Sequence, residues 1–229
     1  LIFDNNYLIE IGIKIKFLKA RFLFALIIII SLLVIISIIS LAKGSVYISN
    51  KDIWLAIFQQ GEEINQTIIR DLRLPRLMAS LLVGSSLGMS GALLQGMLKN
   101  GLASPYLLGI SAGSGLVIVF FISFGLTQSF IPFAAWVGAV LTTLIVFILS
   151  RDGNKIVVER LVLGGVAISS LFGAIQATLL LQVEDGRIQA ALNWLIGSLN
   201  ARGWEDIKFV ALPILMALFI GLFLSRQLN

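Results

Sequence analysis

Uncharged apolar blocks of about 20 residues alternate along the chain with shorter polar segments. Six such blocks occupy residues 22–42, 77–98, 106–126, 132–150, 161–183 and 209–225. A helix of about 20 apolar residues is long enough to cross the roughly 30 Å hydrocarbon core of a bilayer. The pattern therefore predicts an all-α integral membrane protein, a polytopic helical bundle with six spans.

The polar segments between these blocks carry turn and charge signals. Short breaks fall at residues 99–101, 128–129, 151–155 and 184–187, which favour tight connections. Residues 43–76 form a longer polar segment, with an amphipathic stretch at 53–58, and are expected to lie outside the hydrocarbon. The pattern of residues 188–198 predicts a short helix, outside or partly inside the membrane, that is too short to cross it.

The beginning of the chain has basic residues before its first apolar block. Lys14, Lys16, Lys19 and Arg21 precede a stretch of about 20 apolar residues, longer than the 7–15 typical of a signal peptide. We interpret residues 1–21 as a cytoplasmic N-terminal segment and 22–229 as one transmembrane domain. Basic residues beside a first span favour that orientation.

Small residues recur inside the second block. Gly84, Gly88 and Gly91 fall on nearly one helical face, and small residues in membrane helices let a neighbouring helix approach closely. We predict that this face is a helix-packing surface.

Composition supports a membrane protein and excludes several classes of site. The 229 residues are 58% hydrophobic and 13% charged, against about 25% charged residues in soluble domains. The chain has no cysteine and no histidine, which excludes disulfides, thiolate or imidazole metal sites and a histidine-dependent triad. No catalytic residue, metal site or cofactor is predicted. The 17 basic residues are scattered, so no nucleic-acid partner is expected.

One basic cluster lies where the positive-inside rule does not expect it. With a cytoplasmic N-terminus, the motif Arg73-Leu74-Pro75-Arg76 comes at the outer mouth of the second span, with Pro75 in its first turn. Two guanidinium groups there are suited to docking the carboxylates of a soluble partner. The alternative is that both side chains reach towards lipid headgroups.

Several ordered motifs resemble the permeases of bacterial ABC importers for ferric siderophores, haem and cobalamin. They cover roughly residues 40–229 and comprise Arg73-Leu74-Pro75-Arg76, Gly84, Ser90-Gly91-Ala92-Leu93-Leu94-Gln95, Asn100-Gly101-Leu102-Ala103-Ser104-Pro105, Leu108-Gly109-Ile110-Ser111-Ala112-Gly113, Leu161-Val162-Leu163-Gly164-Gly165-Val166-Ala167 and Trp194-Leu195-Ile196-Gly197-Ser198-Leu199 with Trp204-Glu205-Asp206.

The resemblance implies partners and roles for four residues. Such permeases have about ten helices, work as a pair in the cell membrane, sit on two cytoplasmic ATPase subunits and receive substrate from an extracytoplasmic binding protein. Arg73 and Arg76 match the arginines that pair with glutamates on that protein. Asn100 and Leu102 match a tight turn that narrows the cytoplasmic end of the pathway, where Gly101 replaces the usual proline.

The resemblance also concerns the length of the chain. Members of the family are about 100 residues longer, and the remainder would follow residues 224–229. We therefore expect six spans of a ten-helix permease, without the last four spans and the region that couples to the ATPase.

Three functions compete at this level. The spans have uncharged centres, which disfavours an ion relay, and the sequence has no G-x-x-x-x-G-K-[ST] phosphate loop. An importer permease for an iron–siderophore complex, energised by a separate ATPase, is preferred over haem or cobalamin import. A passive channel or scaffold is less favoured. Gly109-Ile110-Ser111-Ala112-Gly113 fits a G-x-S-x-G hydrolase elbow, but that elbow needs a preceding strand and a histidine.

Overall fold

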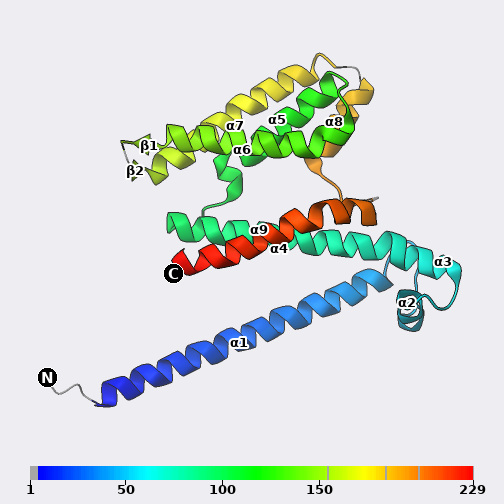
Figure 1. Ribbon diagram of the computed structural model, residues 1–229, viewed down its shortest axis with the longest axis vertical. Helices are drawn as coiled ribbons and strands as arrows, with labels where there is room; N and C mark the ends of the chain where they lie inside the picture. Colours follow the sequence, from blue (N-terminus) through cyan, green and yellow to red (C-terminus); the bar gives the residue numbers. More distant parts are fainter. Residues whose placement is uncertain (1–4, 154, 184, 201, 229) are drawn as a thin grey trace. The chain divides into compact units, whose positions relative to one another are not determined.

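The computed structural model describes residues 5–153, 155–183, 185–200 and 202–228, and it is almost entirely helical (Figure 1). The described helices are α1 (Asn5–Ala42), α2 (Asn50–Ile57), α3 (Glu63–Gln66), the π-helix η1 (Thr67–Arg73), α4 (Leu74–Leu98), the 3-10 helix η2 (Pro105–Leu108), α5 (Ile110–Ser123), the 3-10 helix η3 (Gln128–Phe130), α6 (Ile131–Leu149), α7 (Val158–Leu180), α8 (Asp185–Ile196) and α9 (Trp204–Leu228). A small hairpin, β1 (Arg151–Asp152) and β2 (Lys155–Ile156), joins α6 to α7. The all-α class predicted from the sequence is confirmed.

The chain divides into two compact units. The first contains residues 1–79 with 201–207, and the second contains residues 80–200 with 208–229. Residues 1–4 of the predicted N-terminal segment lie outside the described residues, whereas residues 5–21 continue the first span as one helix.

Five of the described helices are long and apolar enough to cross a membrane. They cover Ala20–Ala42, Glu63–Leu98, Gln128–Leu149, Val158–Leu180 and Trp204–Gln227. They match five of the six predicted spans. The third predicted span, residues 106–126, is instead divided into η2 and the 14-residue α5. At a rise of about 1.5 Å per residue, α5 alone is shorter than the hydrocarbon core.

Glycines account for this division. Gly109 has a left-handed φ of 72° and links η2 to α5, a conformation that glycine adopts without steric cost. Gly165 of α7 lies so close to η2 that a Cβ there would be 3.0 Å from the Cα of Leu108. The missing side chain lets the backbone of η2 pack directly on α7, and the helix restarts after Gly109.

The second predicted span begins earlier than its apolar block suggests. A continuous helical segment runs through α3, η1 and α4, so Pro75 lies inside it rather than in a first turn. Proline has no N–H to donate within a helix. The wider π-type turns of η1 come immediately before it, where the N–H of Leu74 bonds to the carbonyl oxygen of Ile69. The expectation that Pro75 lies in a first helical turn therefore holds for α4, which begins at Leu74, but not for the whole helical segment.

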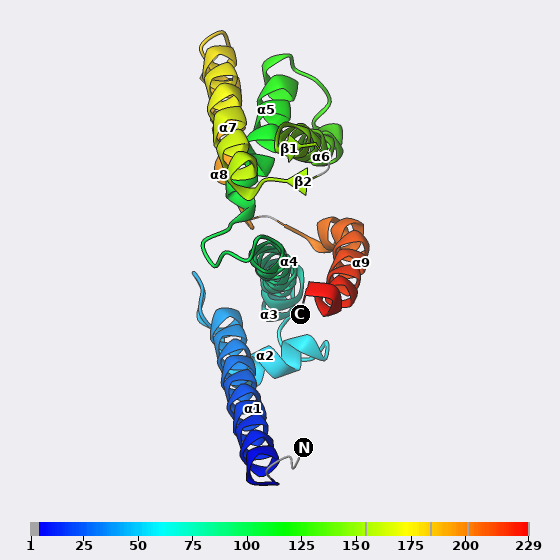
Figure 2. The ribbon, with the colours of Figure 1, turned by 90° about the vertical axis from the view of Figure 1, so that its left-hand side faces the viewer.

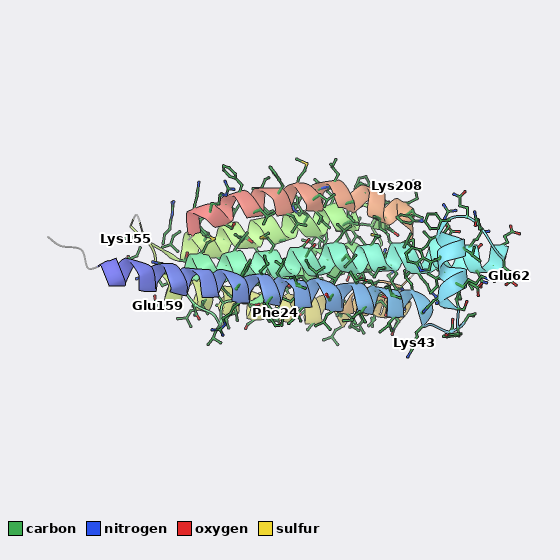
Figure 3. The ribbon with its side chains drawn as sticks, turned by 90° about the horizontal axis from the view of Figure 1, so that it is seen from below. Phe24, Lys43, Glu62, Lys155, Glu159 and Lys208 are labelled. Atoms are coloured by element: carbon green, nitrogen blue, oxygen red, sulfur yellow. The ribbon has the colours of Figure 1, made fainter. Side chains whose placement is uncertain are left out.

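Helix α5 is the centre of the second unit. It packs against α6, α7 and α8 (Figure 2). Ile118, Val119 and Ile122 of α5 are buried with Ile131 and Ala191. In this unit, Lys155 and Glu159 lie at one end and Lys208 at the other (Figure 3). Charged residues at both ends of apolar helices fit a unit that crosses a bilayer.

Candidate functional site

The end of α1 and the side chain of Arg73 meet in the first unit. The Nη1 atom of Arg73 donates to the carbonyl oxygens of Leu41 at 2.5 Å and Ala42 at 3.0 Å, and Nη2 donates to that of Val46. The last carbonyls of a helix have no partner within the helix and carry partial negative charge. The guanidinium of Arg73 therefore caps the C-terminus of α1.

Apolar contacts hold this region together. Leu41 and Ala42 of α1 are buried with Ile53 and Ala56 of α2 and with Ile69 of η1. Ser49 caps α2 by accepting a hydrogen bond from the N–H of Asp52 at 3.2 Å. The amphipathic stretch predicted within residues 53–58 is thus a real helix, and its buried face fixes η1 against the end of α1. Figure 3 shows Lys43 and Glu62 at this end of the unit, away from Phe24 in the middle of α1.

Arg76 lies one helical turn after Arg73 and is exposed, whereas Arg73 is half-buried. Side chains three positions apart on a helix lie on neighbouring parts of its surface. The structure thus places both predicted docking arginines together at one end of the first unit. What they bind stays a prediction.

A second arginine cap occurs in the other unit, where sequence reasoning did not anticipate it. Arg187 of α8 donates from Nη1 to the carbonyl oxygen of Ser123, the last residue of α5, at 3.1 Å. Gly125, with a left-handed φ of 65°, follows α5 and lies beside the Arg187 guanidinium, where a Cβ would be in ordinary contact at 3.5 Å. Both caps join a cation to a helix C-terminus, a favourable pairing.

Asn100 and Leu102 form the tight turn that the sequence predicts between α4 and η2. The N–H of Leu102 donates to Oδ1 of Asn100 at 2.9 Å, and Nε2 of Gln95 donates to the carbonyl oxygen of Gly101 at 3.1 Å. The side chain of Leu102 is 86% exposed. Gly101 does not have a positive φ, and a Cβ there would meet nothing within 4 Å. The Asn100 side chain therefore builds this turn without requiring glycine at 101.

The predicted packing glycines of α4 have no close neighbour among the described residues of their own unit. A Cβ built at Gly84, Gly88 or Gly91 meets no atom within 4 Å. Packing of this face stays a prediction, and it requires a helix other than those seen close to it in this unit. Instead, Gly221 of α9 lies close to α4, since a Cβ at Gly221 would be 3.1 Å from Cγ of Met89 in α4.

A close helix crossing in the second unit is at Gly113 of α5 and Gly138 of α6. A Cβ at Gly113 would be 2.7 Å from the carbonyl oxygen of Gly138 and would overlap the hydroxyl of Thr142. The pattern of glycines in the sequence did not predict this pair, because each helix has a single glycine at the crossing.

Polar side chains in the apolar helices of this unit join helices. Ser114 of α5 donates to the carbonyl oxygen of Ala135 at 3.0 Å, and Gln176 of α7 donates to that of Ala112 at 3.0 Å. The G-x-S-x-G stretch has a 3-10 helix before it instead of the strand that a hydrolase elbow needs. The structural context of that motif is therefore wrong for a hydrolase.

The described residues indicate no metal site, and one groove between their helices has an apolar lining. Among them, no group of three or more His, Cys, Asp or Glu side chains is close enough to hold a metal ion. A groove of about 580 Å³ between α5 and α6 has walls formed by Phe121, Phe130, Phe133 and apolar neighbours. Such a lining suits hydrocarbon rather than a polar substrate.

Comparisons with known proteins point to one family. A model of the FecCD transport family matches residues 32–229. The Fe(3+)-citrate import system permease protein YfmE of Bacillus subtilis is 34% identical over 203 residues, covering 88% of this chain and 60% of YfmE. The ferric enterobactin transport system permease protein FepD of Escherichia coli is 36% identical, covering 86% of this chain and 60% of FepD.

The similar proteins also include a hemin transport permease and a transporter of known structure. The hemin transport system permease protein HmuU of Yersinia pestis is 34% identical, covering 86% of this chain and 60% of HmuU. A solved inward-facing structure assigned to the metal-chelate type of ABC transporter is 30% identical with a TM-score of 0.76, covering 92% of this chain and 64% of that one. The chain thus spans about 60% of the length of these curated relatives.

Proposed function

Because the chain belongs to the FecCD transport family, we propose that it acts as a membrane-spanning permease subunit of an ATP-driven importer. The substrate proposed is an iron–siderophore complex delivered by an extracytoplasmic binding protein. The family match over residues 32–229 carries this proposal. Helices of membrane-crossing length and permease relatives make the chain a multi-pass membrane protein.

Energy for transport is proposed to come from a separate ATPase subunit. The sequence has no phosphate-binding loop of the G-x-x-x-x-G-K-[ST] type. The apolar helices have uncharged centres, which is unfavourable for coupling to an ion gradient. A second permease subunit is proposed to complete the pathway. The chain itself is proposed to be a transport subunit and not an enzyme.

The proposed orientation puts the N-terminus in the cytoplasm of a bacterial cell. The C-terminal end of α1, together with Arg73 and Arg76, then faces outward, where a binding protein can reach it. The same orientation puts the C-terminus of α5 and Arg187 outside. Two basic residues that oppose the positive-inside rule thus each cap a helix end. This supports the proposed orientation, because capping a helix end explains why each of these two arginines lies on the outer side.

Docking is proposed at Arg73 and Arg76, and the cytoplasmic narrowing of the pathway at Asn100 and Leu102. The exposed Leu102 side chain presents an apolar group at a turn whose backbone is fixed by Asn100. An apolar group at a narrow point passes a bulky chelate without binding it tightly. The proposed helix-packing face at Gly84, Gly88 and Gly91 is available to a helix from elsewhere in the importer.

The test is uptake of radioiron-labelled ferric siderophore by bacterial cells that carry this permease with its partner subunits. Matched cells carry an ATPase inactivated in its phosphate loop. ATP-dependent uptake is expected, and uptake that persists with the inactive ATPase would instead indicate a passive channel.

Haem or cobalamin import is the alternative, because HmuU and a vitamin B12 permease, BtuC of Vibrio parahaemolyticus, are also about one-third identical to this chain. Labelled haem and cobalamin are therefore assayed in the same cells. Uptake of either one without uptake of ferric siderophore would assign the alternative.

A further inference from the structure

The docking site is connected to α1 through the guanidinium of Arg73. A guanidinium has five N–H donors in one plane. Two on Nη1 and one on Nη2 are directed at the carbonyl oxygens of Leu41, Ala42 and Val46. Among the described residues, these three bonds leave the N–H of Nε and the second N–H of Nη2. These two neighbouring donors are enough to bind one carboxylate in a bidentate manner.

The contacts of Arg73 fix the position of its head group. A surface arginine normally samples several rotamers, and ordering it costs conformational entropy on binding. Here three carbonyls from the end of α1 and the following turn hold the head group before any partner arrives. A preorganised arginine loses less entropy when a carboxylate binds to it.

Gly44 is the residue of the turn that permits this arrangement. A Cβ built at Gly44 would be 2.7 Å from Nη2, 3.0 Å from Cζ and 3.3 Å from Nε of Arg73. Because Cζ is nearer to this Cβ than Nε is, the Cβ would lie over the face of the guanidinium and not beside its Nε–Nη2 edge. Gly44 does not have a positive φ, so alanine adopts the same backbone without strain. The effect of a side chain at position 44 is therefore confined to its clash with the guanidinium.

We propose that the C-terminal turn of α1 positions Arg73 for binding-protein docking, and that Gly44 leaves room for the face of its guanidinium, which holds the Nε–Nη2 edge in position. This inference rests on the proposed docking function and adds Gly44 to it as a positioning residue. The partner group that this edge recognises is a carboxylate of the binding protein.

A double-mutant cycle tests this inference in the assembled importer. The variants are Gly44→Ala, Arg73→Ala and their combination, with Ser45→Ala as the control because Ser45 is exposed in the same turn. The measurements are the binding-protein concentration that gives half-maximal uptake, the maximal uptake rate and the amount of assembled importer in the membrane. The first of these reports on docking, and the last on folding.

Gly44→Ala is expected to raise the half-maximal concentration by about three- to tenfold, as expected when one contact is weakened by about the strength of an ordinary hydrogen bond. The maximal rate is expected to stay unchanged. In the Arg73→Ala background, Gly44→Ala is expected to have no further effect, because the two residues act through one contact. Ser45→Ala is expected to match the unmodified importer.

Two results would overturn the inference: no effect of Gly44→Ala, or the same effect of Gly44→Ala with and without Arg73. Failure of the docking proposal itself is distinguishable, because Arg73→Ala would then leave the half-maximal concentration unchanged.

Arg73→Lys keeps the test decisive if Gly44→Ala lowers assembly. Lysine keeps the charge without the planar fork. The Arg73→Lys importer is expected to dock more weakly but to tolerate alanine at position 44, with restored assembly. A persistent assembly defect in that background would show that Gly44 acts on the fold alone, and this too would overturn the inference.

Discussion

The indole Nε1 of Trp204 donates a hydrogen bond of 2.8 Å to the backbone carbonyl oxygen of Arg70, which lies 134 residues earlier in the chain. In the π-type pattern of η1, this carbonyl would accept from the residue five positions later, which is Pro75. Proline has no N–H, and the N–H of Leu74 is already bonded to Ile69. Trp204 therefore supplies the donor that Pro75 lacks.

Trp204→Phe is expected to destabilise the protein because it removes this donor and keeps an aromatic ring. The expected loss is about 1–2 kcal/mol, since a part-buried carbonyl then loses its hydrogen bond. Thermal unfolding of the purified protein in detergent measures it. Trp136→Phe is the matched control, since the Trp136 side chain is 64% exposed. An equal change in both variants would contradict the role of the Trp204 hydrogen bond.

Pro75→Ala is expected to make the Trp204 indole less important. Alanine restores an N–H that can bond to the carbonyl of Arg70 or Asp71. The destabilisation caused by Trp204→Phe is therefore expected to be smaller in the Pro75→Ala background, by about 0.5–1 kcal/mol. The same unfolding assay on both single variants and the double variant measures this coupling. Strictly additive effects would show that Pro75 and Trp204 act separately.

Gly113→Ala is expected to disrupt the crossing of α5 and α6. Its Cβ would overlap the hydroxyl of Thr142 and lie 2.7 Å from the carbonyl oxygen of Gly138. Overpacking of this kind costs about 1–3 kcal/mol or more. Gly173→Ala on α7 is the control, because a Cβ there meets nothing within 4 Å. The yield of folded protein after detergent extraction compares them, and a yield as low for Gly173→Ala would argue against a local clash.

Charge reversal tests the docking arginines. Arg73→Glu combined with Arg76→Glu is expected to weaken association of the binding protein by more than about tenfold, because like charges then face each other. Reversing the partner's glutamates to arginines is expected to restore association. High salt is also expected to weaken association of the binding protein with the unmodified importer, since salt screens exposed charges. Unchanged association after the double reversal would mean that the arginines only anchor the helix.

Asn100→Ala is expected to loosen the turn between α4 and η2, because Leu102 loses the acceptor for its N–H. Asn100→Asp keeps an oxygen in the same place and is expected to preserve the turn. If this turn narrows the pathway, Asn100→Ala changes the uptake rate while Asn100→Asp leaves it nearly unchanged. Uptake assays at saturating binding protein compare the two. Equal uptake rates for both variants and the unmodified importer would show that this turn does not narrow the pathway.

Much of the candidate site could be located from the sequence because its chemistry is local. The two arginines are three positions apart on one helix, and the Asn100 side chain bonds to a backbone group two residues later. The partners of Arg73 could not be found this way, since Leu41 and Val46 come from a separate segment. The contacts of Gly44 with Arg73 and of Trp204 with the carbonyl of Arg70 were not predicted for the same reason, since each joins segments that are apart in the sequence.

By itself, the sequence determined the class of the protein and the position of its apolar helices, because burial in hydrocarbon requires long uncharged stretches. Only the tertiary structure decided that the third apolar block divides at Gly109. There, η2 packs closely against α7 at Gly165. It also decided that Pro75 lies inside a helix and that Arg73 caps α1. Each of these depends on the distance between segments remote in the chain, which periodicity and composition do not contain.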